Sequence, residues 1–295
     1  MSLRHEKLQE RSGNYVLTIG FPSAGKTVLQ SWLTRYIMTQ GPFRSELDNV
    51  GDTSTSADFD MNRVVNTWMD QWSDGRFPEP TPVGEDEIRE IKLKVTPLYG
   101  VKSPLEFGFL EISGEMMQSV IPGDTENPSL SRVLLEFLRN SNINLVIIML
   151  IDPASDDNDR LFFNLMNFLD ANLSYNIRDK ASLALVASKP DVALDRLRTH
   201  NRKYAAHADL TGEVLEDYIS FAVPSMYKEY YDWPKKRKVL SRFHIGDVEM
   251  DEQGPKVAYP SYVSAENLFG WIYLQFKGHR LGYGPMGRFW RWIRQ

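Results

Sequence analysis

Cysteine is absent from the 295 residues of this chain, and so are long apolar runs. Without cysteine the chain forms no disulfide, no thiolate metal site and no cysteine nucleophile. The longest apolar run, residues 145–151, has seven residues, whereas a membrane-spanning helix needs roughly 18. The first residues are charged and lack an apolar signal core. We therefore expect a cytoplasmic protein.

Acidic residues are missing from the end of the chain. None follows Glu266, whereas five basic residues do, although the chain as a whole has a net charge of −5. Arg288, Arg291 and Arg294 share one side of a short predicted helix whose other side is aromatic and apolar. We call residues 277–295 the basic aromatic tail. It either docks on the acidic body of the protein or makes a peripheral contact with an anionic membrane surface.

The remaining composition is that of a globular protein. Apolar residues make up 42% of the chain and charged residues 25%, which excludes a disordered, collagen-like or coiled-coil chain. We interpret residues 1–295 as one enlarged domain.

A phosphate-binding motif lies near the start of the chain. Residues 20–27 read G-F-P-S-A-G-K-T, which is G-x-x-x-x-G-K-T, between a predicted buried strand (residues 15–19) and a predicted helix that ends near Gly41. Backbone N–H groups of such a loop cradle phosphates. Lys26 would reach the β- and γ-phosphates, and the Thr27 hydroxyl would bind Mg²⁺. The predicted binding residues are Gly20, Ser23, Ala24, Gly25, Lys26 and Thr27.

The later apolar patterns predict an α/β fold. Residues 91–96 alternate apolar and polar, which is typical of a strand buried on one face, and we expect it to be the antiparallel strand at the edge of the sheet. Residues 107–114, 144–152 and 182–187 are more continuously apolar, as parallel strands covered on both faces are. A helix is expected over residues 160–173. The expected architecture has three layers, with a mostly parallel sheet, one antiparallel edge strand and helices on both faces.

Together these features resemble the Ras-like and Arf-like GTPases, in the translation-factor-related class of P-loop proteins. In that family the third strand ends in D-x-x-G, and the run Glu111-Ile-Ser-Gly114 occupies that position here. The resemblance implies that Glu111 helps to hold Mg²⁺ and that Gly114 contacts the γ-phosphate. Glu111 replaces the family's Asp and is one methylene longer. Glu115 stands where the family often carries the glutamine that orients the attacking water.

The resemblance also implies a guanine-binding site. The family motif N-K-x-D appears as Ser188-Lys189-Pro190-Asp191, with Ser in place of Asn. Its Asp accepts hydrogen bonds from guanine, and its Lys stem stacks on the base. The family's S-A-x motif matches Ser264 and Ala265. An alternative alignment makes residues 239–248 the last strand and places the base-contacting turn near Gly246.

Two long segments exceed a minimal GTPase. Residues 42–86 form an extended switch-region insertion with a predicted helix at residues 62–72, and they contain Thr81, our choice for the metal-sensing threonine over Thr53 and Thr55. Residues 192–260 form a second insertion, expected to be helical and loop-rich. Insertions of this size serve partners or add a subdomain, so a protein effector is expected there.

The sequence therefore predicts a GTP-binding switch that uses Mg²⁺ and hydrolyses GTP slowly, with Lys26, Thr81 and Glu115 as catalytic residues. An alternative is a nucleotide-binding interaction module with little or no turnover, motivated by Glu111 and Ser188. A P-loop phosphotransferase is a third reading, although such an enzyme needs neither the alternating strand nor the Ser-Lys-Pro-Asp motif. No nucleic-acid partner is expected.

Overall fold

The computed structural model describes residues 11–48, 60–79, 88–112 and 132–282. They contain a seven-stranded sheet in the order β2-β3-β4-β1-β5-β6-β7 and a separate hairpin, β8-β9. The strands of the sheet are β1 (Gly13–Ile19), β2 (Phe43–Leu47), β3 (Ile88–Pro97), β4 (Leu105–Ile112), β5 (Ile143–Ile151), β6 (Ala181–Ala187) and β7 (Lys238–Arg242). The hairpin consists of β8 (Gly246–Asp251) and β9 (Gly254–Pro260).

Strand directions confirm the expected mostly parallel sheet. β1 pairs in parallel with β4 and β5, β6 with β5, and β7 with β6. β3 is antiparallel to both of its neighbours in this sheet, β2 and β4. The expected antiparallel strand is therefore present, as β3.

The place of β3 as the outermost strand was wrong. β2 pairs outside it, with Phe43 opposite Pro97 and Leu47 opposite Leu93. The alternating burial of β3 arises because one of its two faces is only partly covered. An alternating pattern shows that one face of a strand is less buried than the other, but it does not show whether another strand pairs beside it. β2 is short and polar in its centre, so its own pattern did not mark it as a strand.

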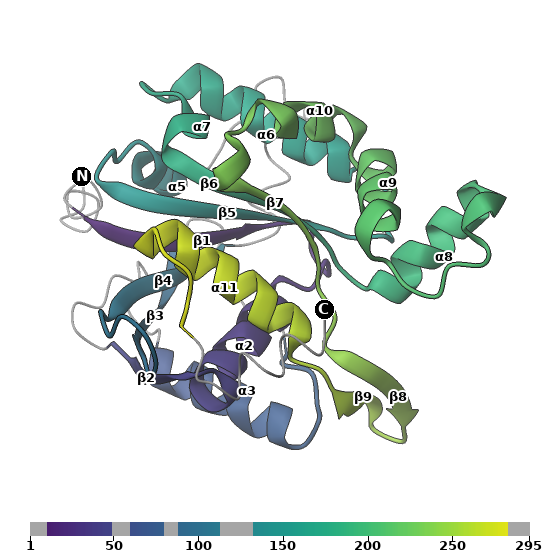
Figure 1. The fold of residues 1–295 in the computed structure, drawn as a ribbon, viewed down its shortest axis with the longest axis horizontal. Coiled ribbons are helices and arrows are strands. Elements are labelled where there is room, and N and C mark those ends of the chain that lie inside the picture. The colour runs from purple at the N-terminus through teal and green to yellow at the C-terminus, as the bar shows by residue number, and fades with distance from the viewer. Residues whose placement is uncertain (1–10, 49–59, 80–87, 113–131, 283–295) are drawn as a thin grey trace.

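Helices cover both faces of the sheet (Figure 1). On one face lie α2 (Lys26–Arg35), α3 (Met61–Ser73) and α11 (Val263–Lys277), and a π-helical turn, η1 (Tyr36–Gln40), extends α2 up to Gly41. The helices associated with the other face are α5 (Arg132–Leu138), α6 (Asn158–Asn172), α7 (Ile177–Lys180), α8 (Pro190–His200), α9 (Gly212–Ala222) and α10 (Pro224–Asp232). The short 3₁₀ turns are η2 (Arg202–Tyr204) and η3 (Lys235–Arg237).

The core divides between the two faces of the sheet as strand geometry requires. Alternate residues of β5 point to opposite faces: Ile147 and Met149 belong to the cluster under α6 and α10, while Ile148 belongs to the cluster under α2 and α11. Both sides of β5 are covered, which explains its continuous apolar run.

Each predicted insertion contributes to the sheet as well as to its covering. The segment over residues 42–86 supplies β2 and α3, and α3 is capped by Asp60, whose side chain accepts from the Arg63 N–H. The segment over residues 192–260 contains the helices and loops that were expected, but these make up only part of it. It also supplies the edge strand β7 and the β8-β9 hairpin, in agreement with the alternative alignment that placed a last strand there.

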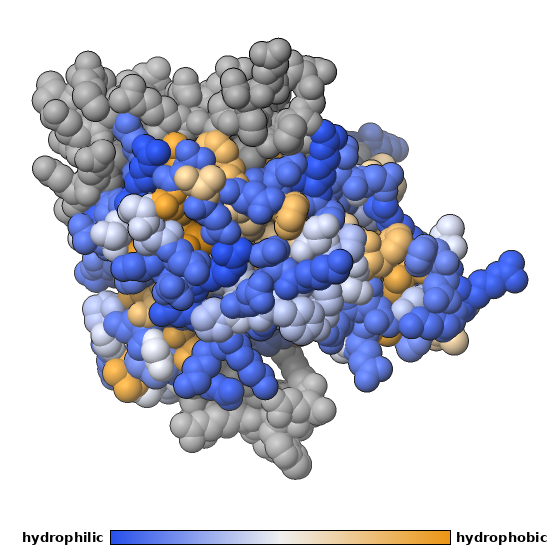
Figure 2. Space-filling model, turned by 90° about the horizontal axis from the view of Figure 1, so that it is seen from above, coloured by the Kyte–Doolittle hydropathy of each residue, from blue (hydrophilic) through white to orange (hydrophobic). Residues whose placement is uncertain are grey.

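The surface is mostly hydrophilic on the face seen from the side of α6 and α10, with apolar residues in small patches (Figure 2). Within the described residues, no helix is both long enough and apolar enough to cross a membrane.

Candidate functional site: a cavity at the carboxyl edge of the sheet

The phosphate loop connects β1 to α2 and has the backbone geometry of an anion site. Ser23 and Gly25 have positive φ angles of 65° and 96°, and a Cβ on Gly20 would lie 3.0 Å from the Leu150 carbonyl oxygen. Gly25 is the N-cap residue of α2, and no described side chain accepts a hydrogen bond there. The first N–H groups of α2 are thus left for a ligand, at the positive end of the helix dipole.

Lys26 is held inside this loop. Its Nζ donates to the carbonyl oxygens of Gly20 and Phe21, at 2.9 and 3.0 Å. Burial lowers the pKa of Lys26 to about 8, and the nearby Glu111 carboxylate opposes this shift. An anion bound in the loop would supply the negative charge that this half-buried ammonium lacks.

Thr27 and Glu111 meet beside the loop. The Thr27 hydroxyl donates to Glu111 Oε1 at 3.3 Å, so the end of β4 adjoins the start of α2. Glu111 is 5% exposed, and its Oε2 has no hydrogen-bond partner among the described atoms. Burial raises the pKa of Glu111 to about 7, while the positive charges of Arg89 and Lys26 oppose the shift.

The chemistry of these two groups suits a cation, because hydroxyl and carboxylate oxygens are ligands that Mg²⁺ accepts. In the part of the chain that the structure describes, no cluster of three or more acidic, histidine or cysteine side chains could hold a metal. A cation beside Thr27 and Glu111 would therefore share its remaining ligands with phosphate oxygens and water.

The turn after β6 reaches back to the phosphate loop. Lys189 adopts a left-handed backbone conformation with φ of 47°, and its Nζ donates to the Ser23 carbonyl oxygen at 3.2 Å. Ser188 is buried, and its hydroxyl donates to the Ile151 carbonyl oxygen at 2.8 Å. Asp191 follows in the first turn of α8. The Ser-Lys-Pro-Asp turn is thus anchored to both β5 and the phosphate loop.

Sequence reasoning missed the role of Asp152 in this anchoring. Asp152 is 5% exposed and pairs with Lys189 Nζ at 3.0 Å, while the same carboxylate oxygen accepts from the Ala154 N–H. Its position directly after the buried strand β5 was the available signal, because the carboxyl ends of parallel strands meet at one edge of the sheet.

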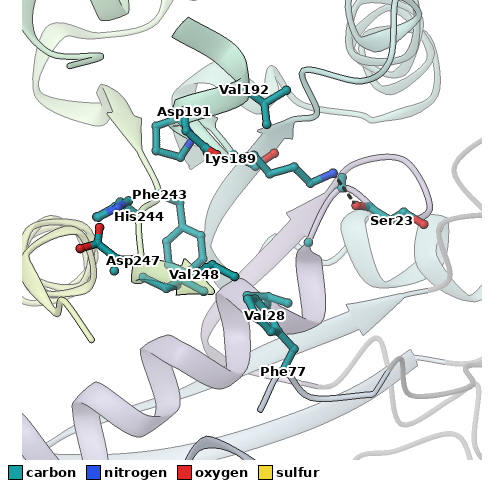
Figure 3. Close-up of a pocket in the computed structure, with 16 residues that line it drawn as sticks. Ser23, Val28, Phe77, Lys189, Asp191, Val192, Phe243, His244, Asp247 and Val248 are labelled. Carbon is teal, nitrogen blue, oxygen red and sulfur yellow. Dashed lines mark hydrogen bonds between the residues drawn. The ribbon is translucent and has the colours of Figure 1, made fainter. Parts of the chain in front are cut away.

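These segments surround a cavity of about 540 Å³. The phosphate loop contributes Ser23, Ala24 and Gly25, and the turn after β6 contributes Ser188 to Val192. Its remaining lining residues are apolar or come from the segment after β7, namely Val28, Phe77, Phe243, His244, Ile245, Gly246, Asp247 and Val248. In Figure 3, Lys189 and Asp191 lie on one side of the cavity, and Val28 and Phe77 lie on the other.

Ser264 and Ala265 do not line this cavity. Both are buried in the first turn of α11, and the Ser264 hydroxyl accepts from the His244 N–H at 3.1 Å. Ser264 thus holds the segment after β7 through the backbone of His244. Gly246, where the alternative alignment places the base-contacting turn, does line the cavity. Phe77 and the residues around Gly246 had no periodic pattern that marked them as site residues.

Several predicted residues lie outside the described part of the chain. They are Thr81 and its competitors Thr53 and Thr55, Gly114, Glu115, and the basic aromatic tail from residue 283 onward. Of the other predicted residues, the structure brings the phosphate loop together with Glu111, Ser188, Lys189 and Asp191.

No protein-family model and no curated protein matches the chain. Among solved structures, the chain is similar to one described as the signal recognition particle receptor SRb-GTP/SRX complex from Chaetomium thermophilum, with 14% sequence identity and a TM-score of 0.38. The match covers 90% of this chain and 98% of that one. At this TM-score the likeness does not bear on function.

Proposed function

We propose that this chain binds a guanine nucleotide, GTP or GDP, together with Mg²⁺, that it hydrolyses GTP slowly, and that it acts as a nucleotide-dependent switch. The observation that carries the proposal is a cavity lined both by the phosphate loop and by the turn that holds Lys189 and Asp191. A nucleotide needs an anion site and a base site in one cavity, and the loop and the turn that line this cavity are our candidates for the two.

The phosphate end is supported by the contacts of Lys26 and Thr27. On binding, the Lys26 ammonium would exchange its two carbonyl contacts for phosphate oxygens. Thr27 and Glu111 would hold Mg²⁺, which fits the unpartnered Glu111 Oε2 described above. Bound Mg²⁺ would supply neutralisation of the charge on the β- and γ-phosphates.

The base end is supported by Asp191. A carboxylate at this position would accept hydrogen bonds from N1–H and the exocyclic amine of guanine, two donors that adenine does not present together. The Lys189 stem would cover one face of the base, since its Nζ is held toward the phosphate loop by Ser23 and Asp152. The apolar side chains of Val28 and Phe77 form the opposite side of the cavity.

For the hydrolytic step, Lys26 would stabilise charge on the phosphates, Thr81 and Gly114 would contact the γ-phosphate region, and Glu115 would orient the attacking water. Turnover would be slow, because the sequence identifies no arginine finger. An effector on the two insertions, a cytoplasmic location and a peripheral membrane contact of the basic aromatic tail stay predictions from the sequence.

Glu111 favours a second candidate, a nucleotide-binding module with little or no turnover. Its side chain is longer than the aspartate of the related motif, and it bonds to the Thr27 hydroxyl, the same group that Mg²⁺ would need. A metal that binds weakly here would leave the nucleotide bound but unreacted.

Equilibrium binding of fluorescently labelled GTP and ATP, each with and without Mg²⁺, tests the proposed function. We expect GTP to bind more tightly than ATP and Mg²⁺ to strengthen GTP binding. Equal affinity for both nucleotides, or no binding, would refute guanine-nucleotide binding. Single-turnover hydrolysis with excess protein then separates the two candidates, because phosphate release no faster than the buffer blank would identify the module.

A further inference from the structure

The β8-β9 hairpin is docked on the turn that follows α3. A lone two-stranded hairpin is marginally stable, but here the Gly75 carbonyl oxygen accepts from the Val257 N–H at 2.8 Å, and Arg76 forms a β-bridge with Lys256. Gly75 has φ of 73°, and a Cβ there would lie 3.0 Å from the Val257 oxygen. Glycine thus permits this close backbone approach, and the turn becomes a partial third strand of the hairpin.

The Arg76 guanidinium reinforces this contact. Its two terminal nitrogens donate to the two carboxylate oxygens of Asp251 at 2.8 and 2.6 Å, and one of them also donates to Gln253 Oε1 at 2.9 Å. The hydrogen bond from Arg76 holds the pKa of Asp251 below its usual value. A bidentate pair fixes relative orientation as well as distance, which is what a positioning contact requires.

Each partner of this ion pair belongs to a segment that also lines the cavity. Phe77 follows Arg76 directly and lines the cavity, as do Asp247 and Val248 at the start of the hairpin. Figure 3 shows Val248 near Val28 and Phe77, on the side of the cavity away from Lys189. The Phe77 ring also lies 5.6 Å from the Trp72 ring of α3. One wall of the cavity is therefore built from the two insertions, joined through Arg76 and Asp251.

We propose that Arg76 and Asp251 are positioning residues for the nucleotide: their ion pair holds Phe77 and the β8-β9 hairpin together as one wall of the base site and so slows nucleotide release. The inference rests on the proposed function. Neither residue lines the cavity, so both act through Phe77 and Val248. Breaking the pair loosens this wall but leaves the phosphate loop and Asp191 in place, so nucleotide leaves faster while the preference for guanine over xanthine is kept.

Release of N-methylanthraniloyl-GDP, chased with unlabelled GDP, measures the effect in the full chain. Because the pair is partly exposed, we expect Arg76→Ala and Asp251→Ala each to raise the release rate on the order of threefold. If the two residues act as a pair, the double variant releases no faster than the faster single variant. Glu252→Ala is the matched control, since Glu252 is an exposed neighbouring acid and is expected to release at the wild-type rate.

Three outcomes would overturn the inference while the proposed function stands. The first is unchanged release in both single variants, and the second is additive effects in the double variant. The third is a fall in the urea unfolding midpoint of each variant that is proportional to the rise in its release rate. Such a correlation, measured by far-UV circular dichroism, would assign the pair a purely structural role. A wild-type chain that binds no labelled GDP would overturn both the inference and the proposed function.

Discussion

Trp72 joins α3 to α2, the helix that follows the G-x-x-x-x-G-K-T loop. It is 3% exposed, its Nε1 donates to the Ser31 hydroxyl at 3.0 Å, and its ring lies edge-on to Trp32 with 4.7 Å between ring centroids. Trp72→Phe removes this hydrogen bond and leaves the Ser31 hydroxyl without its donor. The smaller ring also leaves unfilled space against Trp32.

The cost of Trp72→Phe is the sum of these two effects. Loss of a buried neutral hydrogen bond costs about 1 kcal/mol, and the partial loss of aromatic packing costs about 1 kcal/mol more. Trp72→Ala removes the whole ring and should cost about 4 kcal/mol. The free energy of unfolding of a domain is only about 5–15 kcal/mol, so Trp72→Ala could remove most of it. Trp72→Phe is therefore the better probe.

Urea unfolding followed by far-UV circular dichroism measures this cost without relying on the fluorescence of the remaining tryptophans. Asn66→Ala is the control, because Asn66 lies on the exposed face of the same helix and its loss should change the free energy of unfolding by less than about 0.5 kcal/mol. If Trp72→Phe is as stable as Asn66→Ala, then α3 does not pack on α2 through Trp72, and the reasoning fails.

Three further predictions concern the loop, the base site and the hairpin. Lys26→Ala should abolish the rise in melting temperature that GTP and Mg²⁺ produce, and an unchanged rise in a thermal-shift assay would contradict the phosphate-loop assignment. Asp191→Asn should shift the preference from GTP toward xanthosine triphosphate in competition binding, and retained GTP selectivity would mean that another residue recognises the base. Gly246→Ala should destabilise the chain toward urea by about 1–3 kcal/mol, since Gly246 has φ of 119° and a Cβ would meet the Tyr259 oxygen at 1.9 Å. Gly254→Ala, with φ of 111° and open space around its Cβ, separates backbone strain from this clash and should cost less.

The candidate phosphate loop could be predicted from the sequence because its motif is local. The loop over residues 20–27, the strand before it and the helix after it are neighbours in the chain, so glycine spacing and apolar periodicity were enough to locate them. The same holds for α3, β5 and β6, whose patterns matched the structure. Strands that end at one edge of a parallel sheet also bring Glu111 and Lys189 to the loop, which follows from topology alone.

The far wall of the cavity was decided only by tertiary packing. Phe77 and the segment from Phe243 to Val248 come from different insertions and have no periodicity that marks them. They meet because the turn after α3 pairs with β9 and because Arg76 reaches Asp251 across the hairpin. The outer position of β2 has the same origin, since a short strand with a polar centre is stabilised by its ladder with β3 rather than by its own sequence. The amino-acid sequence thus predicted the loop at which we propose that phosphate binds, and long-range pairing of weakly patterned segments decided which residues form the opposite wall of the cavity.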